Sequence, residues 1–333
     1  MRVVLADPPA FTPPYDHALA VALADAGAEV QLVTSRFRYG DLPAPAGYAR
    51  REVFYPLSSR LFRRSRLRLP LKALEHPLGL AWLAATQADV VHVQWLGLPE
   101  LDVRLLRHRA PLVLTAHDLL PRRTASKHGL WRRLFARFER VVVHSERGRE
   151  TLAAFGVPDE RLRVIPHPVW PGDPVRRDDS RTVLALGLVR PYKQLEHARA
   201  AVARVPGAVL RVAGDANSFL PESEIDRALA ESTVAVFPYR AELDQSGALL
   251  RALGAGVPAV VYDVGGLAEP VRAFGAGRVV APDDVDALAA ALRELLEDAD
   301  ALAEARAGAL RARAELTWAA AAGAHLDLYR ELL

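Results

Sequence analysis

The segment PHPVWPGDP, residues 166–174, divides the sequence into two halves that follow the same pattern. Four prolines in nine residues exclude both a helix and a central strand, because proline lacks the N–H donor that those structures need. On either side of this segment, short β-branched runs alternate with amphipathic stretches. Such an alternation requires crossover connections and predicts a parallel sheet in each half. We interpret residues 166–174 as the linker between two α/β domains.

The pattern also gives approximate boundaries for the elements of both halves. In the first half it predicts strands at 2–6, 29–34, 89–93, 111–115, 140–144 and 163–165, and helices that include 17–26 and 131–138. In the second half it predicts strands at 181–187, 208–213, 233–237, 258–262 and 278–281, then helices at 285–297, 301–315 and 318–333. We expect domains over 1–168 and 175–315, with a ligand-binding cleft between them.

Composition excludes several classes of protein. The chain has 333 residues and no cysteine, which excludes disulfides, thiolate metal sites and cysteine nucleophiles. The N-terminus lacks the apolar core of a signal peptide, and no apolar run reaches the roughly 18 residues that span a bilayer. We therefore expect a cytoplasmic protein. The net charge of +3 conceals +9 over residues 1–170 and −6 over 171–333, which indicates two domains with different partners.

Residues 186–193, with the sequence LGLVRPYK, follow the first predicted strand of the second half. Gly187 permits the backbone to approach a ligand closely at the strand end. Arg190 and Lys193 come next; a guanidinium can bind two phosphate oxygens at once, and an ammonium adds a point charge. The pattern predicts a diphosphate site, and the alternative is a solvated basic turn.

A second anion-binding pattern follows the predicted strand 233–237. Gln245, Ser246 and Gly247 precede a predicted helix that runs to about residue 255. The N–H groups and the positive dipole end of a helix start attract phosphate, whereas the structural alternative is an ordinary serine N-cap. Farther along, a double glycine at 265–266 precedes Glu269, which faces either a ligand or solvent.

The first half has no Gly-x-Gly-x-x-Gly motif after its first strand, and residues 7–15 are rich in proline. A dinucleotide dehydrogenase needs glycines there, so this turn excludes that mode of pyrophosphate binding. We expect instead a stiff loop at a cleft edge. His117 follows the strand 111–115, where an imidazole can donate a hydrogen bond or stabilise charge near neutral pH. The alternative is a helix start with Asp118 as its N-cap.

Residues 60–72, RLFRRSRLRLPLK, contain six cations and no acid. Leucines and one phenylalanine interleave with the charges, and such a segment can lie on an anionic membrane surface. The candidate membrane contacts are Arg63, Arg64, Arg66 and Arg68. No nucleic-acid partner is expected, because the sequence shows no recognised nucleic-acid module. A merely solvated basic surface is the alternative.

Several motifs, taken in order along the chain, resemble glycosyltransferase family 4. In the first half these are DVVHVQW at 89–95, LTAHDLLP at 114–121, VVHSE at 142–146 and VIPHPV at 164–169. In the second half they are GLVRPYK at 187–193, the PYR and QSG motifs within 238–247, GVP at 256–258, and GG with a following glutamate at 265–269. The ordered set covers nearly the whole chain.

The resemblance implies a GT-B fold. In this fold two Rossmann-like parallel-sheet domains face each other across a cleft, and the C-terminal helix, here 318–333, crosses back to the N-terminal domain. The resemblance further implies retaining transfer of a hexose-type sugar from a UDP- or GDP-sugar to an acceptor hydroxyl, without a cofactor or a metal. It implies that Arg190 and Lys193 bind the diphosphate. It also implies that His117 and Glu242 contact the donor sugar.

The same resemblance divides the other site residues between donor and acceptor. The donor-binding set is Gly187, Gln245, Ser246, Gly247 and Glu269. The acceptor-side set, on the basic N-terminal half, is Pro14, Tyr15 and Trp95. A glycan, a lipid-linked molecule or a small molecule is the expected acceptor. The basic segment 60–72, and not the resemblance, adds an anionic membrane surface as an expected further partner.

The sequence departs from the family pattern in two places. The family has two glutamates eight positions apart; the second corresponds here to Arg251, and the first falls near Leu243. The stretch between residues 215 and 237 is also short for the family. Two alternatives therefore stay open. One is a nucleotide-sugar-binding or scaffold protein with impaired catalysis, and the other is a different GT-B enzyme such as a nucleotide-sugar epimerase or a phosphorylase.

Overall fold

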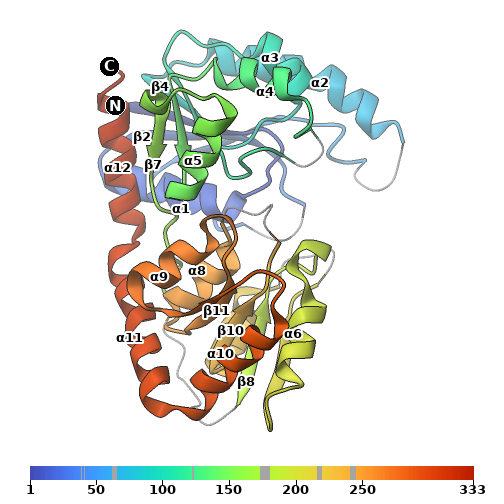
Figure 1. Cartoon of the computed structure of the whole chain (residues 1–333). Helices are drawn as coiled ribbons and strands as arrows, with labels where there is room; N and C mark the ends of the chain where they lie inside the picture. The colour runs from blue at the N-terminus through green and yellow to red at the C-terminus, as the bar shows by residue number, and fades with distance from the viewer. Residues whose placement is uncertain are drawn as a thin grey trace. The chain divides into compact units, whose positions relative to one another are not determined.

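The computed structural model describes residues 1–38, 40, 42–61, 66–121, 124–172, 181–215, 220–240 and 245–333. They form two compact units, each built on its own parallel sheet (Figure 1). Unit 1 comprises Met1–Ile165 and Trp318–Leu333, and unit 2 comprises Pro166–Thr317. The last helix thus belongs to the same unit as the first strand.

Unit 1 contains a seven-stranded sheet with the order β3-β2-β1-β4-β5-β6-β7. Its strands are β1 (Arg2–Asp7), β2 (Glu29–Ser35), β3 (Ala49–Phe54), β4 (Val90–Val93), β5 (Leu112–Thr115), β6 (Arg140–Val143) and β7 (Leu162–Val164). Its helices are α1 (Pro13–Asp25), α2 (Arg68–Ala85), α3 (Pro99–Leu105), α4 (His128–Phe135), α5 (Glu146–Phe155), the 3-10 helix η1 (Asp159–Arg161) and α12 (Trp318–Arg330). Because β1 pairs with both β2 and β4, the switch point of this sheet lies between β1 and β4.

The central strands of unit 1 differ from its edge strand in burial. Every residue of β4 and of β5 is buried, as expected for a parallel sheet covered on both faces. The edge strand β3, with the sequence ARREVF, is largely exposed. Sequence analysis missed β3 because charged side chains, which are typical of sheet edges, interrupt the β-branched run.

Helix α1 begins earlier than predicted because two prolines open it. Pro13 and Pro14 occupy its first turn, where the missing N–H has no intrahelical partner to lose and φ is already helical. The loop predicted at 7–15 is therefore wrong in its second part. Pro14 and Tyr15 lie in the helix, and only the residues before Pro13 form the turn.

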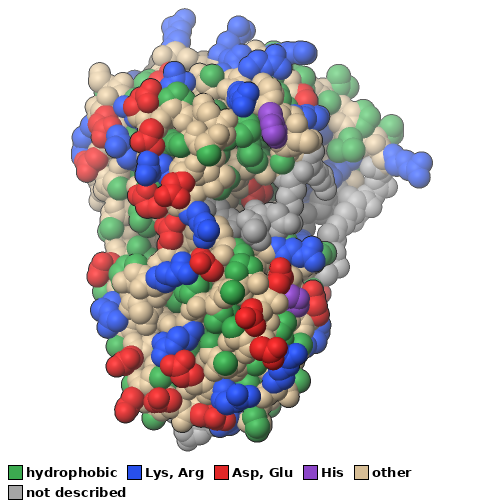
Figure 2. Space-filling view, viewed as in Figure 1, with side chains coloured by type: hydrophobic (Ala, Val, Ile, Leu, Met, Phe, Trp, Pro, Cys, Tyr) green, Lys and Arg blue, Asp and Glu red, His purple; other side chains and the backbone are tan. Residues whose placement is uncertain are grey.

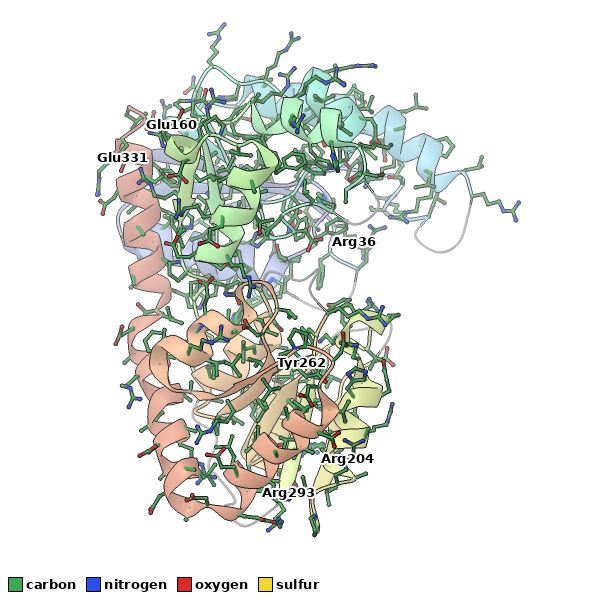
Figure 3. All side chains as sticks on the ribbon, in the orientation of Figure 1. Arg36, Glu160, Arg204, Tyr262, Arg293 and Glu331 are labelled. Carbon is green, nitrogen blue, oxygen red and sulfur yellow. The ribbon has the colours of Figure 1, made fainter. Side chains whose placement is uncertain are left out.

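Helix α12 packs against α1 and is tied to the sheet of unit 1. The Tyr329 hydroxyl lies 2.6 Å from His92 Nδ1, and His92 Nε2 lies 2.7 Å from the Thr115 hydroxyl. At the end of α12, Glu331 accepts a hydrogen bond of 2.5 Å from Arg163 (Figure 3). Burial holds the pKa of His92 well below its usual value, so this imidazole joins helix and sheet in its neutral form.

Unit 2 contains a five-stranded sheet with the order β12-β11-β10-β8-β9. Its strands are β8 (Thr182–Leu186), β9 (Val209–Ala213), β10 (Val234–Phe237), β11 (Ala259–Tyr262) and β12 (Gly277–Val280). Its helices are η2 (Pro191–Lys193, 3-10), α6 (Leu195–Val202), α7 (Glu222–Ala230), α8 (Gly247–Gly254), η3 (Gly265–Leu267, 3-10), α9 (Ala268–Phe274), α10 (Val285–Glu297) and α11 (Ala299–Glu315). The predicted strands of this half are confirmed. The switch point lies between β8 and β10, where open α/β sheets bind ligands.

Candidate functional site

The predicted diphosphate-binding residues gather where β8 of unit 2 ends. Gly187 has a φ of +92°, which glycine adopts without steric strain. A Cβ at this position would lie 2.9 Å from Lys193 Nζ and 3.3 Å from Ala248 Cβ. The lack of a side chain at Gly187 therefore lets the turn after β8, the lysine and the first turn of α8 meet at one point.

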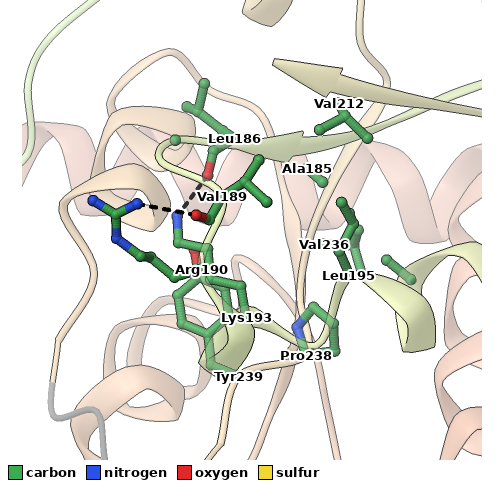
Figure 4. A pocket seen from close by; sticks show the side chains of 12 residues that line it. Ala185, Leu186, Val189, Arg190, Lys193, Leu195, Val212, Val236, Pro238 and Tyr239 are labelled. Carbon is green, nitrogen blue, oxygen red and sulfur yellow. Dashed lines mark hydrogen bonds between the residues drawn. The ribbon is translucent and has the colours of Figure 1, made fainter. Parts of the chain in front are cut away.

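Lys193 is the central cation of this cluster (Figure 4). Its Nζ donates a hydrogen bond of 3.0 Å to the Leu186 carbonyl and lies 5.1 Å from the centre of the Tyr239 ring. Burial lowers the pKa of Lys193 to about 8, and the neighbouring Arg190 charge acts in the same direction. Lys193 is therefore mostly charged at neutral pH. An ammonium has three N–H donors, so the site has donor capacity beyond the bond to Leu186.

Arg190 lines the same pocket as Lys193. Its backbone is extended and leads into η2, and its Nη1 donates a hydrogen bond of 3.2 Å to the Val189 carbonyl. The remaining lining residues of the pocket are Ala185, Leu186, Gly187, Val189, Leu195, Ala198, Val212, Val236, Pro238 and Tyr239. Two cations in a largely apolar pocket favour an anionic ligand, because weak dielectric screening strengthens the attraction between charges.

The start of α8 lies beside this cluster. Ser246 is the N-cap, and its hydroxyl accepts a hydrogen bond of 3.4 Å from the Leu249 N–H. The helix start predicted at Ser246 and Gly247 is thus confirmed. The N–H groups of a first helical turn have no partner within the helix, and the dipole adds positive potential. This end of α8 suits a phosphate group next to Lys193.

The other donor-side residues lie on loops that adjoin α8. Gln245 Nε2 donates a hydrogen bond of 3.1 Å to the Gly266 carbonyl, which links the start of α8 to the double-glycine turn. Glu269 lies in the first turn of α9 and is half-buried. Glu242 lies outside the described residues.

Arg251 explains how the chain accommodates its departure from the family pattern. Its guanidinium forms two hydrogen bonds to the Glu222 carboxylate of α7, at 2.5 and 2.8 Å. It also lies 5.0 Å from the centre of the Trp170 ring. The side chain that replaces the family's second glutamate is therefore held by an ion pair, and it offers no carboxylate to a ribose hydroxyl.

His117 is the centre of a second cluster, at the carboxyl ends of the strands of unit 1. Its Nε2 lies 3.0 Å from Gln94 Oε1, and its Nδ1 lies 3.3 Å from His144 Nε2. His144 Nδ1 donates a hydrogen bond of 3.0 Å to the Ile165 carbonyl, and burial lowers the pKa of His144 to about 4. A neutral His144 presents Nε2 as an acceptor, so its contact with His117 places a proton on His117 Nδ1. Gln94 Oε1 can also only accept, so both ring nitrogens of His117 face acceptor atoms.

Aromatic rings contact the His117 imidazole from two directions. Trp95 stacks on it with a centroid distance of 5.2 Å and an angle of 15°, and Tyr15 meets it edge-on at 4.8 Å. The Trp95 indole N–H donates a hydrogen bond of 2.7 Å to the Thr12 hydroxyl. The exposed Phe11 lies edge-on against Trp95 at 5.3 Å. The structure thus brings together His117, Tyr15 and Trp95, while Pro14 is half-buried on the same helix turn as Tyr15.

A buried acid pair holds the loop that carries Phe11 and Thr12, and sequence analysis missed it. Asp7 ends β1 and Asp16 lies in the first turn of α1, and both are buried. Asp7 Oδ2 accepts hydrogen bonds from the N–H groups of Phe11 at 2.8 Å and Thr12 at 3.3 Å. Burial raises the pKa of Asp7 to about 6, and it raises the pKa of Asp16 well above its usual value. The two carboxyl groups therefore share a proton at neutral pH.

Two other predictions about unit 1 have different outcomes. The alternative that made Asp118 a helix N-cap is wrong, because residues 117–121 form no helix and α4 begins only at His128. In the basic segment, Arg66 is exposed and Arg68 is the half-buried first residue of α2. Arg63 and Arg64 lie outside the described residues.

The described residues contain neither a metal-binding cluster nor a membrane-spanning helix. None of their histidine, aspartate and glutamate side chains form a group of three or more that could hold a metal ion. No helix among them is both long and apolar enough to cross a membrane.

Solved structures with the same fold identify its class. Sucrose-phosphate synthase from Thermosynechococcus elongatus is 20% identical, with a TM-score of 0.76 over 100% of this chain and 99% of that one. Anabaena HepE in complex with UDP-glucose is 15% identical, with a TM-score of 0.68 over 100% of both chains. Likeness at such low identity establishes the fold alone. The two Rossmann-like units give this chain the predicted GT-B class.

Sequence models of known families match both units. The model of Glycosyltransferase Family 4 matches residues 15–171, and the model of Glycosyl transferases group 1 matches residues 180–298. The chain belongs to the family 4 glycosyltransferases. The resemblance found in its motifs is thereby confirmed.

A curated relative matches part of the chain. An exopolysaccharide phosphotransferase of Streptomyces coelicolor is 30% identical over 184 residues, which are 47% of this chain and 20% of that protein. The chain spans about a fifth of the length of the curated relatives it matches.

Proposed function

We propose that this protein transfers a hexose-type sugar from a UDP- or GDP-sugar to an acceptor hydroxyl, with retention of configuration and without a metal. The observation that carries the proposal is the meeting of Gly187, Lys193 and the first turn of α8 at the end of β8. Arg190 adds a second cation to the same pocket. Two cations and a helix start at a switch point suit a diphosphate. The fold shared with a protein solved with UDP-glucose supports this donor class.

Lys193 and Arg190 act on the leaving group in this proposal. As the bond between the anomeric carbon and the phosphate oxygen breaks, negative charge grows on the diphosphate. Fixed cations stabilise that charge, and such electrostatic stabilisation is often the largest contribution to catalysis. The acceptor oxygen forms its bond on the same face of the carbon, and its proton passes to a phosphate oxygen. The bond that breaks, the bond that forms and the transferred proton thus balance without a metal.

The remaining site residues bind the donor and the acceptor. The N–H groups of Ser246 and Gly247 bind phosphate, and Gln245, Glu269 and Glu242 contact other parts of the donor. In unit 1, His117 contacts the donor sugar during transfer. Pro14, Tyr15 and Trp95 border the acceptor, which is a glycan, a lipid-linked molecule or a small molecule.

The direct test is donor binding by unit 2. A ligand that binds only the folded state raises the unfolding temperature by mass action. UDP, GDP and their hexose conjugates, screened in the presence of EDTA, should give such a shift for one nucleotide series. The double variant R190A/K193A should lose it, whereas R204A should keep it, because Arg204 is an exposed cation of unit 2 that pairs with Asp286 (Figure 3).

A turnover assay then distinguishes a transferase from a protein that only binds the donor. Release of the nucleoside diphosphate that depends on added acceptor supports the transferase, and release that needs Mg²⁺ contradicts the metal-free mechanism. If the donor raises the unfolding temperature of R190A/K193A as much as that of the unmodified chain, the assignment of the donor site to these residues is contradicted.

The ion pair between Arg251 and Glu222 favours a second candidate function, a nucleotide-sugar-binding protein without catalysis. The family's carboxylate is absent at this position, and the guanidinium is committed to Glu222. Donor binding with no product across a broad panel of acceptors supports this second candidate. Any new glycosidic product, identified by mass spectrometry, contradicts it.

A further inference from the structure

Helix α2 of unit 1 presents an apolar face to solvent. The exposed fractions are 69% for Leu67, 72% for Leu74, 72% for Leu78 and 38% for Trp82. Intervals of seven, four and four residues place these side chains on one stripe of a helix with 3.6 residues per turn. A surface helix normally turns its apolar stripe inward, so the orientation of α2 requires an explanation.

The carboxylate of Glu75 fixes this orientation from the opposite face. It is buried, and its two oxygens accept hydrogen bonds from the backbone N–H groups of Leu57 at 2.7 Å and Ser58 at 3.0 Å. Rotating the helix to hide its leucines would break both bonds and leave the N–H groups without their acceptor.

His76 provides a second attachment on the buried face of α2. Its Nδ1 lies 2.7 Å from the Tyr55 hydroxyl, and its Nε2 lies 2.6 Å from Asp102 Oδ1. Gly79 is one turn farther along, where a Cβ would lie 2.3 Å from the Phe54 ring. The face of α2 that carries these residues and the buried Leu80 and Leu83 is therefore the inward one, and the leucine stripe is held outward.

The charges next to the stripe along the sequence are mostly positive. Glu75 is the only acid between residues 55 and 86, and it is 7% exposed. Arg60 and Arg66 are exposed, and Arg68 is half-buried at the helix start. In the space-filling view, hydrophobic and cationic side chains lie together over the outer end of α2 (Figure 2). The described part of this segment, residues 55–61 and 66–86, therefore combines exposed leucine with arginine, while the exposed acids nearest in the fold, Glu52 and Glu100, lie on β3 and α3.

We propose that the α2 stripe, Leu67, Leu74, Leu78 and Trp82, inserts into the surface of an anionic lipid bilayer while the flanking arginines contact lipid headgroups. Interfacial helices bind in this way, with leucine and tryptophan on one face and basic residues beside them. Charge complementarity selects this occupant over a second copy of the chain, whose α2 would bring the same arginines into opposition. The inference stands on α2 alone and goes beyond the proposed transferase function.

Flotation with lipid vesicles tests the proposal. The full chain, without any nucleotide, should float with phosphatidylglycerol vesicles in low salt, and far less with phosphatidylcholine vesicles. The variant L74E/L78E should bind at least tenfold more weakly. L310E is the matched control, since Leu310 is 52% exposed on α11 of unit 2, and it should bind like the unmodified chain. Because no donor is present, the result is independent of the proposed function.

Tryptophan fluorescence gives a second measurement at the stripe itself. Trp82 is one of five tryptophans, and vesicles should shift the emission to shorter wavelength in the unmodified chain but not in W82F. R66E/R68E should lose the preference for anionic lipid. Equal vesicle binding by L74E/L78E and the unmodified chain would overturn the proposal. So would a dimer in solution that L74E/L78E converts to a monomer while neither protein binds vesicles.

Discussion

The side chains at the carboxyl ends of the strands differ in charge between the two units. In unit 2 the turn after β8 brings Lys193 and Arg190 to one largely apolar pocket next to a helix start. In unit 1 the corresponding positions carry His117 and His144, joined by a hydrogen bond, and a pair of carboxyl groups that share a proton. The unit 2 end therefore carries fixed positive charge. The unit 1 end instead combines two imidazoles with an acid pair that shares one proton and keeps one negative charge.

This difference indicates what each unit can bind. Fixed cations favour a ligand with permanent negative charge, such as a diphosphate. Imidazole, indole and amide groups favour hydroxyl groups, because they donate and accept hydrogen bonds. The same α/β architecture thus supports two sites, and the side chains at the strand ends decide between them.

The largest effect is expected when the buried charge of unit 2 is removed. K193M should lower kcat/KM by about 100- to 1000-fold, the range found when one group that stabilises a transition state is lost. The free energy of unfolding should not fall, because methionine fills the apolar pocket without a desolvated ammonium. Parallel assays of turnover and urea unfolding check both statements, with R204A as the control. A loss of activity that merely follows a loss of stability contradicts the assigned role.

The pKa of about 8 for Lys193 adds a pH test of the same charge. The folded pKa lies below the ordinary value for lysine, so above pH 8 the unfolded chain binds more protons than the folded one. Stability therefore rises with pH from about 8 to the ordinary lysine pKa of about 10.4, and K193M should remove that rise. Activity should instead decline through the same range as the ammonium loses its proton.

A smaller effect is expected when a side chain is added at Gly187. G187A places a Cβ 2.9 Å from Lys193 Nζ in a backbone with φ of +92°. Donor affinity should fall about tenfold, or about 1.4 kcal/mol, and stability by about 1 kcal/mol. The control is G207A, which has a similar backbone strain with φ of +71° but only Arg181 side-chain atoms nearby, at 3.6 Å. G207A should lose stability and keep its donor affinity.

The sequence predicted the site of unit 2 more completely than that of unit 1. Gly187, Arg190 and Lys193 lie within seven residues of one another after a strong β-branched run, so a local pattern revealed their meeting. The start of α8 was equally visible from Ser246 and Gly247. Only the contact between Ala248 and Gly187 could not be predicted from the sequence, because it depends on the pairing of β8 with β10 in the folded sheet.

The cluster around His117 could be predicted only in part. Gln94 and His144 stand at strand ends, which is a usable signal, but their bonds to His117 join residues 23 and 27 positions apart. The Asp7 and Asp16 pair gave no signal, because an acid in the first turn of a helix is usually a solvated favourable charge. Pro13 and Pro14 made the start of that helix look like a loop in the sequence. Burial, rather than residue type, makes these two carboxyl groups unusual.

A change at His144 should perturb the cluster around His117 more mildly. H144F removes the acceptor for His117 Nδ1 and leaves the Ile165 carbonyl without its hydrogen bond of 3.0 Å. We expect kcat to fall about tenfold through a misplaced His117, with donor affinity unchanged because donor binding lies in unit 2. H144Q, whose amide can replace the bond to Ile165, should recover stability. A weaker donor affinity in H144F would show that the two clusters are coupled in the ground state.

The smallest effect concerns the shared proton of Asp7 and Asp16. Both carboxyl groups have pKa values raised by burial, that of Asp7 to about 6 and that of Asp16 well above its usual value, so from about pH 4 upward the folded state binds more protons than the unfolded one. Stability therefore rises as pH falls through that range. D16N mimics the protonated acid and keeps an N–H donor toward Asp7. It should raise Tm by a few degrees at pH 7, and the gain should shrink as the pH approaches 4. D16L, which lacks the donor, should instead lower Tm at both pH values. An equal Tm for D16N and the unmodified chain at pH 7 would mean that the proton is not shared, and that both carboxyl groups of the pair are ionised.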